Sequence, residues 1–366
     1  MTEPTERSDG GPEGGALIVH LARGREWRGG ERQVLQLLRA LAAGGEWRQV
    51  LLTRTGAALA RAAAEAALRP VEVPWSTALD PRVVISALRQ VRAVTGSAIV
   101  HAHDSHALLL GLAASRLAGC ALVATRRSTT APGRMWRHPD RVIAISRAVE
   151  VALLRAGVQP SRIAVVPSGV DVTALTAARS DYPLQAASEV ISLGALTREK
   201  GHRILVEAFA RVAVRLPHAR LTIAGDGPER GALEALIKDH RLETRVTLAG
   251  QLADPVPRLA QAAVMVQPSL REALGTAVLE AMAVGVPVVG SAVGGLTELL
   301  GEGGGVLVPP GDPGTLAEAI IALLQDAGRR AAAREKAWDR VCHYDIRGMA
   351  ERCAQVYRSA LNQPGR

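Results

Sequence analysis

Aromatic residues and cysteines are scarce in this chain of 366 residues. Aromatic side chains make up 2% of it, and only three cysteines occur, Cys120, Cys342 and Cys353. Their number is odd and their spacing matches no metal-binding or redox motif, so they indicate neither kind of site. A reducing cytoplasm is the compartment that fits this usage best. We interpret the low aromatic content as a compositional bias of the source.

Long apolar runs are absent as well. No uninterrupted apolar stretch reaches about 18 residues, the length that a membrane-spanning helix needs. Residues 1–15 are polar, acidic and rich in glycine and proline, which indicates a disordered tail and not a signal peptide. We therefore expect a cytoplasmic protein.

Lysine is rare, and the charge is unevenly placed. Residues 1–180 hold 23 Lys and Arg against 14 Asp and Glu, whereas residues 181–366 hold 21 of each, so the first half carries the whole net charge of +9. This asymmetry suggests that the first half meets something anionic, such as a membrane surface, a phosphorylated acceptor or nucleic acid. Solvated arginines spread over a surface would explain it equally well.

Short apolar runs alternate with helical patterns along the whole chain. This alternation predicts parallel sheets with helices on both faces, and the length predicts two domains, joined by a linker at 173–188. The expected strands are 16–22, 50–53, 71–73, 98–101, 121–125, 141–146, 190–196, 220–224, 245–251 and 263–266.

Two glycine-rich turns follow expected strands. Gly29 and Gly30 precede a helix, which is a phosphate-loop arrangement, although the pair alone is weak evidence. The turn Gly225-Asp226-Gly227 lacks the third glycine of Gly-x-Gly-x-x-Gly, which disfavours a dinucleotide-dependent oxidoreductase.

A pair of glutamates brackets another helix start. Glu272 lies in the loop before a helix opened by Gly275, and Glu280 lies on that helix. If all the positions between them were helical, the two would be roughly 12 Å apart, which fits the two ends of a nucleotide sugar. Between them, the amides of Leu274, Gly275 and Thr276 would favour an anion such as a diphosphate. Ordinary compensation of the helix dipole is the alternative.

Polar residues also follow the strand 98–101. His101 is the last residue of this strand, and His103, Asp104 and His106 follow its carboxyl end, where open α/β sheets bind ligands. A metal site is one interpretation. However, the second half supplies no complementary cluster of Cys or His, and Asp-x-Asp occurs nowhere. Helix capping or another structural role is a further alternative.

The segment after the strand 121–125 is the most basic part of the chain. Arginine forks suit phosphate and tryptophan suits a lipid interface, so this segment is a candidate acceptor or membrane surface. A solvated loop is the alternative. Its residues are Arg126, Arg127, Arg134, Met135, Trp136, Arg137 and Arg141.

Five blocks of the sequence resemble a known family, in the right order and over nearly everything from Ala16 to Leu361, and two of them carry most of the matching residues. The block around the glutamate pair is similar to the signature of the family 4 retaining glycosyltransferases of the GT-B fold, although Ala273 stands where the family has glycine. The block 142–171 resembles the end of that family's first domain, with Ser168 in place of asparagine. The matching residues are Ser146, Gly157, Val158, Pro167, Gly169, Val170, Asp171, Ser269, Glu272, Gly275, Glu280, Ala281, Met282, Ala283, Gly285, Pro287, Val288 and Val289.

The resemblance implies two Rossmann-like, doubly wound domains that face each other. Residues 16–175 would bind the acceptor and residues 186–344 the donor, a nucleoside diphosphate sugar. A helix in 345–362 would cross back to the first domain. The reaction implied is a retaining sugar transfer that needs no essential metal or other cofactor and involves no nucleic acid.

The resemblance also implies a role for single residues. Glu280 would bind the donor ribose and Glu272 the transferred sugar, while His103 would orient the reacting sugar. Lys200 would hold the diphosphate, with Arg198 as a substitute for the usual arginine, whose position Ala195 occupies. Gly29 and Gly30 would lie over the diphosphate, and Gly250 and Gln251 would border the base.

The acceptor is the least determined part of the prediction. Three features look similar to bacterial enzymes that build lipopolysaccharide core or other envelope glycans: the positively charged first domain, the block 101–106 and the pair Arg126-Arg127. This resemblance implies a glycan or lipid-linked acceptor and a position on the inner face of the cytoplasmic membrane. An epimerase or phosphorylase of the same fold is one alternative, and a non-catalytic nucleotide- or sugar-binding protein is another.

Overall fold

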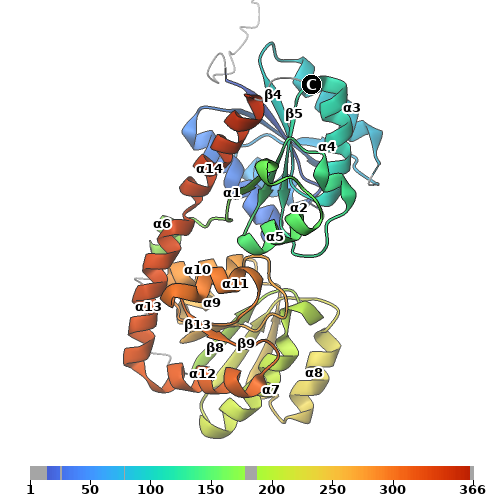
Figure 1. Ribbon diagram of the computed structural model, residues 1–366. Helices are drawn as coiled ribbons and strands as arrows, with labels where there is room; N and C mark the ends of the chain where they lie inside the picture. The colour runs from blue at the N-terminus through green and yellow to red at the C-terminus, as the bar shows by residue number, and fades with distance from the viewer. Residues whose placement is uncertain (1–14, 25–26, 78, 178–187, 363–366) are drawn as a thin grey trace, which may run out of the picture.

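The computed structural model describes residues 15–24, 27–77, 79–177 and 188–362. The expected N-terminal tail lies outside these ranges apart from Gly15, and so does the middle of the expected linker. Two parallel sheets dominate the described chain, and apolar clusters under the helices cover both faces of each sheet. The two sheets form separate Rossmann-like domains, as Figure 1 shows, which confirms the predicted fold.

The first domain contains a seven-stranded sheet in the order β3-β2-β1-β4-β5-β6-β7. Its strands are β1 (Leu17–Leu21), β2 (Arg48–Arg54), β3 (Val71–Val73), β4 (Ala98–Ala102), β5 (Ala121–Arg126), β6 (Arg141–Ala144) and β7 (Ile163–Val165). Its helices are α1 (Gly29–Gly44), α2 (Ala58–Glu65), α3 (Pro81–Arg92), α4 (Ser105–Ala118) and α5 (Arg147–Arg155), with the 3-10 turns η1 (Arg134–Arg137) and η2 (Pro160–Arg162).

The second domain contains a six-stranded sheet in the order β10-β9-β8-β11-β12-β13. Its strands are β8 (Glu189–Leu193), β9 (Arg220–Ala224), β10 (Val246–Gly250), β11 (Val264–Gln267), β12 (Val288–Ser291) and β13 (Val306–Val308). Its helices are α7 (His202–Arg215), α8 (Arg230–Asp239), α9 (Val256–Gln261), α10 (Thr276–Val284), α11 (Gly294–Leu300), α12 (Pro313–Gln325) and α13 (Ala327–Val341), with the 3-10 turns η3 (Arg198–Lys200), η4 (Gly301–Gly303) and η5 (Cys342–Tyr344).

Buried strands and polar caps explain the local structure. All five residues of β1 and of β4 are buried, as expected for parallel strands that are covered on both faces. Asp104 then begins α4, because its carboxylate accepts hydrogen bonds from the amides of His106 and Ala107. Asp80 and Ser146 cap α3 and α5 in the same way. Strand ends and helix starts thus place polar residues at one edge of the sheet.

Helices α6 (Val172–Ala177) and α14 (Ile346–Leu361) lie where the chain passes between the domains. Next to them, the amide of Val170 donates to the carbonyl of Tyr344, and the amide of Ile346 donates to the carbonyl of Val170. Helix α14 then packs on α1 and on the central strands of the first sheet, where Tyr357 is fully buried. The C-terminal helix is therefore part of the core of the first domain (Figure 1).

Candidate active site

Helix α10 begins without a side-chain cap. Gly275 precedes its first turn with a φ of 104° and a ψ of 64°, a conformation that favours glycine. A Cβ atom at this position would also lie 2.9 Å from a methyl group of Leu296. Because no described side chain caps this N-terminus, its first amides, including that of Thr276, are left to bind an anion.

Glu272 and Lys200 form an ion pair next to this helix start. Lys200 Nζ lies 2.6 Å from Glu272 Oε2, and the Glu272 side chain is only 10% exposed. The same oxygen accepts from Ser269 Oγ at 3.2 Å and from Gln267 Nε2 at 3.4 Å. Gln267 was not predicted as a site residue, although it ends β11 just before the loop that carries Glu272. All three contacts involve Oε2, and no described side chain donates to Oε1, which is therefore available to a ligand.

Glu280 lies farther along α10 and meets a residue of the first domain. Its Oε1 is 3.2 Å from Arg32 NH1 on α1, and its side chain is 14% exposed. Burial raises the pKa of Glu280 above its ordinary value, while Arg32 acts in the opposite direction. The sequence did not predict this arginine as a site residue, because its partner lies 248 positions away.

The start of α1 comes close to three of the predicted donor residues. A Cβ atom on Gly29 would lie 3.2 Å from Thr276 Oγ1, so the glycine lets the two domains approach. Gln251 Nε2 also donates to the carbonyl of Trp27 at 3.0 Å. Gly29, Thr276, Gln251 and Glu280 therefore lie along one contact between the domains.

Two other predicted donor residues are less closely held. Arg198 is exposed on η3, two residues before Lys200. Gly250 ends β10 with a φ of +70°, which places it in the turn that leads to Gln251. The donor roles of Arg198 and Gly250 stay predictions.

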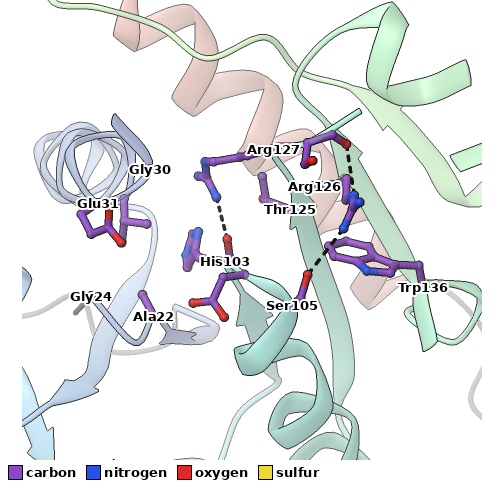
Figure 2. Close-up of a pocket in the computed structure, with 13 residues that line it drawn as sticks. Ala22, Gly24, Gly30, Glu31, His103, Ser105, Thr125, Arg126, Arg127 and Trp136 are labelled. Carbon is purple, nitrogen blue, oxygen red and sulfur yellow. Dashed lines mark hydrogen bonds between the residues drawn. The ribbon is translucent and has the colours of Figure 1, made fainter. Parts of the chain in front are cut away.

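His103 lines a pocket of about 240 Å³ in the first domain. Figure 2 shows Gly30 and Glu31 on the α1 side of this pocket, Arg126 and Arg127 on the β5 side, and His103 between them. Arg127 NH1 donates to the carbonyl of His103 at 2.9 Å. Burial, followed by the neighbouring His101, His20 and Arg127, lowers the pKa of His103 well below its ordinary value. His103 is therefore a neutral imidazole at neutral pH.

Three buried histidines, of which His103 lines this pocket, meet in the first domain. His103 Nε2 lies 2.9 Å from His20 Nδ1, and the two rings stack. His101 is 2.8 Å from both the Tyr357 and the Thr125 hydroxyl. One nitrogen from each of His20, His101 and His103 lies within 4.8 Å of the others, which is the geometry of a possible metal site.

The chemistry of these histidines fits a hydrogen-bonded network better than a metal site. Both nitrogens of His101 already have partners, and His20 and His103 bind each other. Asp104 caps α4 instead, and the His106 side chain is 55% exposed. Sequence reasoning missed His20, although β1 and β4 pair in parallel with His20 opposite His101. Pairing those two strands would have revealed it.

The basic segment after β5 does not form one exposed surface. Trp136 is 2% exposed and Arg126 is 6% exposed, so the predicted membrane role of these two residues is wrong. Arg126 instead donates to the carbonyls of Ser128 and Thr130 and lies over the Trp136 ring. The aromatic ring therefore anchors the loop from inside. Arg127 lines the pocket, whereas Arg134 and Arg137 are exposed.

A second carboxylate also links the two domains. The amides of Arg147 and Ala148 at the start of α5 each donate to the Glu298 carboxylate at 3.0 Å. Glu298 belongs to α11 of the second domain, so a residue of one domain caps a helix of the other.

Comparisons with known proteins agree with this architecture. Residues 27–174 match the family described as Glycosyltransferase Family 4, and residues 183–340 match Glycosyl transferases group 1. A crystal structure of Anabaena Alr3699/HepE in complex with UDP and glucose has a TM-score of 0.79 at 23% identity and covers 94% of this chain and 100% of its own. At this sequence identity, the similarity to the HepE structure shows a shared fold.

Curated relatives extend the match. Glycogen synthase of Mycobacterium tuberculosis H37Rv is 30% identical over 317 residues, which are 78% of this chain and 75% of that protein. D-inositol 3-phosphate glycosyltransferase of Corynebacterium urealyticum is 32% identical over 245 residues, which are 61% of this chain and 58% of that protein. The chain spans about half of the length of the first curated relatives it matches, from 40% to 58%. On these matches, the chain belongs to the family 4 glycosyltransferases of the GT-B fold.

Proposed function

We propose that this chain transfers a sugar, with retention of configuration, from a nucleoside diphosphate sugar to a hydroxyl group of a glycan or lipid-linked acceptor. The uncapped start of α10, flanked by the Lys200–Glu272 pair and by Glu280, carries the proposal. The amides and Lys200 suit an anionic diphosphate, and the two carboxylates suit the hydroxyls of two sugars.

The donor residues act along the length of the donor. Lys200 and the amides at Leu274–Thr276 stabilise the charge on the departing diphosphate, with Arg198 as an additional cation. Glu272 binds the transferred sugar through Oε1, because Lys200 and Ser269 occupy Oε2. Glu280 accepts from the ribose, and Gly250 and Gln251 border the base.

His103 acts on the reacting sugar from the first domain. Its Nε2 faces His20, so Nδ1, which has no partner among the described residues, is the nitrogen that would accept a hydrogen bond from a sugar hydroxyl. A neutral imidazole would also lie close to the cationic transition state without repelling it. The leaving phosphate oxygen takes the proton of the acceptor hydroxyl on the face of the sugar that the diphosphate leaves. This step needs no essential metal.

The acceptor lies on the first domain. Relatives named for glycogen and for D-inositol 3-phosphate favour an acceptor rich in hydroxyl groups. The positive charge of residues 1–180 favours one that carries phosphate or lies at an anionic membrane, as in synthesis of envelope glycans. None of the described helices has the length and apolar character to cross a bilayer. We place the protein on the inner face of the membrane, where the exposed Arg134 and Arg137 would contact lipid phosphates.

Acceptor-dependent turnover tests this proposal. UDP-glucose, GDP-mannose or ADP-glucose is supplied with and without inositol phosphate or an oligosaccharide, and the released diphosphate and the anomer formed are measured. We expect release that requires an acceptor, retains configuration and continues in EDTA. Glu280→Gln should raise the KM for the donor and His103→Ala should lower kcat, each by about tenfold, since each residue acts at a different step.

The matched control is Glu302→Gln, because the Glu302 side chain is 81% exposed. Conversion of the donor without an acceptor would contradict the transferase reaction. Turnover that EDTA abolishes and magnesium restores would contradict the metal-independent step, and an exchange of the two kinetic effects would contradict the residue roles.

A further inference from the structure

Arg32 reaches from the first domain into the donor site of the second. Its NH1 lies 3.2 Å from Glu280 Oε1, and its side chain is 27% exposed, against 14% for the glutamate. The contact engages one carboxylate oxygen. Arg32 does not bond to the other oxygen, Oε2, so a ribose hydroxyl can donate to that oxygen.

The same segment makes two further contacts with the second domain. The carbonyl of Trp27 accepts from Gln251, and Gly29 lies against Thr276. Arg32 is therefore one of three neighbouring points at which residues 27–32 contact the region that would hold base, diphosphate and ribose. The nucleotide would lie against residues of both domains.

We infer that Arg32 is a positioning residue that fixes the Glu280 carboxylate for the donor ribose, so that the ribose site is complete only when the two domains are in contact. The inference rests on the proposed function, in which Glu280 binds ribose. In this role Arg32 contributes to donor binding through Glu280 and does not itself touch the reacting atoms.

Electrostatics support this assignment. A carboxylate as buried as Glu280 is costly unless it is paired. The charged groups that act on it are Arg32 from α1 and Asp254 from the loop before α9, and only Arg32 stabilises the ionised form. Without Arg32, burial and Asp254 would both raise the pKa of Glu280 unopposed. A protonated carboxyl accepts fewer hydrogen bonds from ribose, so donor affinity would fall as the pH is lowered, and this fall would begin at a higher pH than in the wild type.

The experiment compares five proteins: wild type, Arg32→Ala, Arg32→Lys, Glu280→Gln and the double variant Arg32→Ala with Glu280→Gln. Arg39→Ala is the matched control, because Arg39 is exposed on the same helix. Calorimetry measures the Kd of UDP, GDP and ADP between about pH 5 and pH 8. We expect Arg32→Ala to weaken binding of the preferred diphosphate about tenfold at pH 7, which is typical of a lost hydrogen bond to a charged group.

The pH profile separates positioning from a merely structural role. In Arg32→Ala the affinity should start to fall at higher pH than in the wild type, whereas Arg32→Lys, which keeps the charge, should retain the wild-type profile. In the Glu280→Gln background, Arg32→Ala should have no further effect, because the interacting carboxylate is gone.

Four results would overturn the inference. If Glu280→Gln weakens binding but Arg32→Ala changes neither the Kd nor its pH profile, Arg32 does not position the carboxylate, and the proposed function stands. If Arg32→Ala weakens binding equally with and without Glu280, it acts by another route. If Glu280→Gln leaves the Kd unchanged, or if the wild type binds none of the three diphosphates, the inference fails together with the proposed ribose contact.

Discussion

Four histidines are buried in the described chain, and burial keeps them neutral. Desolvation lowers the pKa of His20 to about 3 and that of His202 to about 4, and it lowers the pKa of His101 and His103 well below the ordinary value. In the unfolded chain each would take up a proton near pH 6.5. Between that pH and the lower pKa values of the folded state, the unfolded chain binds more protons than the folded protein. The free energy of unfolding therefore falls as the pH is lowered from about 6.5 towards the folded pKa values.

His202 offers a test of this acid sensitivity, because it lies on α7 and neither ring nitrogen bonds to another described residue. We expect His202→Leu to lose less stability than the wild type between pH 7 and pH 5, by about 2 kcal/mol, since one buried group no longer has to stay unprotonated. Urea unfolding at both pH values measures this difference. His218→Gln is the control, because His218 is exposed. The same loss of stability in His202→Leu and wild type would contradict the account.

Single residues were predictable where their signal is local. Lys200, Glu272 and Glu280 stand within short motifs, and the structure places the first two in contact. Arg32 could not be found in this way, because its importance depends on a partner in the other domain. His20 could be found only from the pairing of β1 with β4, and a run of apolar residues does not predict which strands pair.

At the scale of elements, helix α5 depends on the opposite domain. Its own cap, Ser146, accepts from the amide of Val149, whereas the amides of Arg147 and Ala148 donate to Glu298 on α11. A carboxylate at a helix N-terminus satisfies unpaired amides and complements the helix dipole. This cap therefore stabilises the contact between the domains as well as the helix.

Removal of the cap should loosen that contact. We expect Glu298→Ala to lower the free energy of unfolding by about 1 kcal/mol, the usual effect of a lost N-cap. Small-angle scattering should also show a larger radius of gyration for the variant without donor. Glu302→Ala serves as the control, since Glu302 is exposed on the neighbouring η4 turn. An unchanged radius in Glu298→Ala would show that the cap does not hold the domains together.

Helices and strands were predictable from apolar runs and caps. The predictions failed where they depended on whether a side chain is buried. The expected strand 220–224 coincides with β9, and the expected strand 71–73 coincides with β3. Trp136 was misplaced because a tryptophan among arginines suggests a membrane interface as readily as a buried anchor under a cation. The burial of Trp136, which is 2% exposed, and the packing of Arg126 on its ring distinguish the two.

At the scale of the molecule, the alternation of strands and helices predicted parallel sheets covered by helices, the length predicted two domains, and the family resemblance implied that both are Rossmann-like. It could not predict which residues meet between them. The contacts of Arg32 with Glu280, Trp27 with Gln251, and Glu298 with α5 each join positions more than 100 residues apart. Such contacts arise from the packing of two finished domains and leave no periodic signal in either one.

The central claim is that a nucleoside diphosphate binds at α10 through Glu280, and ligand-dependent melting tests it most directly. Wild type and Glu280→Ala are melted with UDP, GDP, ADP and CMP. A ligand that binds only the folded state stabilises it by about 2.7 kcal/mol at about one hundred times its Kd. We expect one diphosphate to raise the melting temperature of the wild type and to lose that effect in Glu280→Ala. A shift that persists in the variant, or no shift with any of the four nucleotides, would contradict the claim.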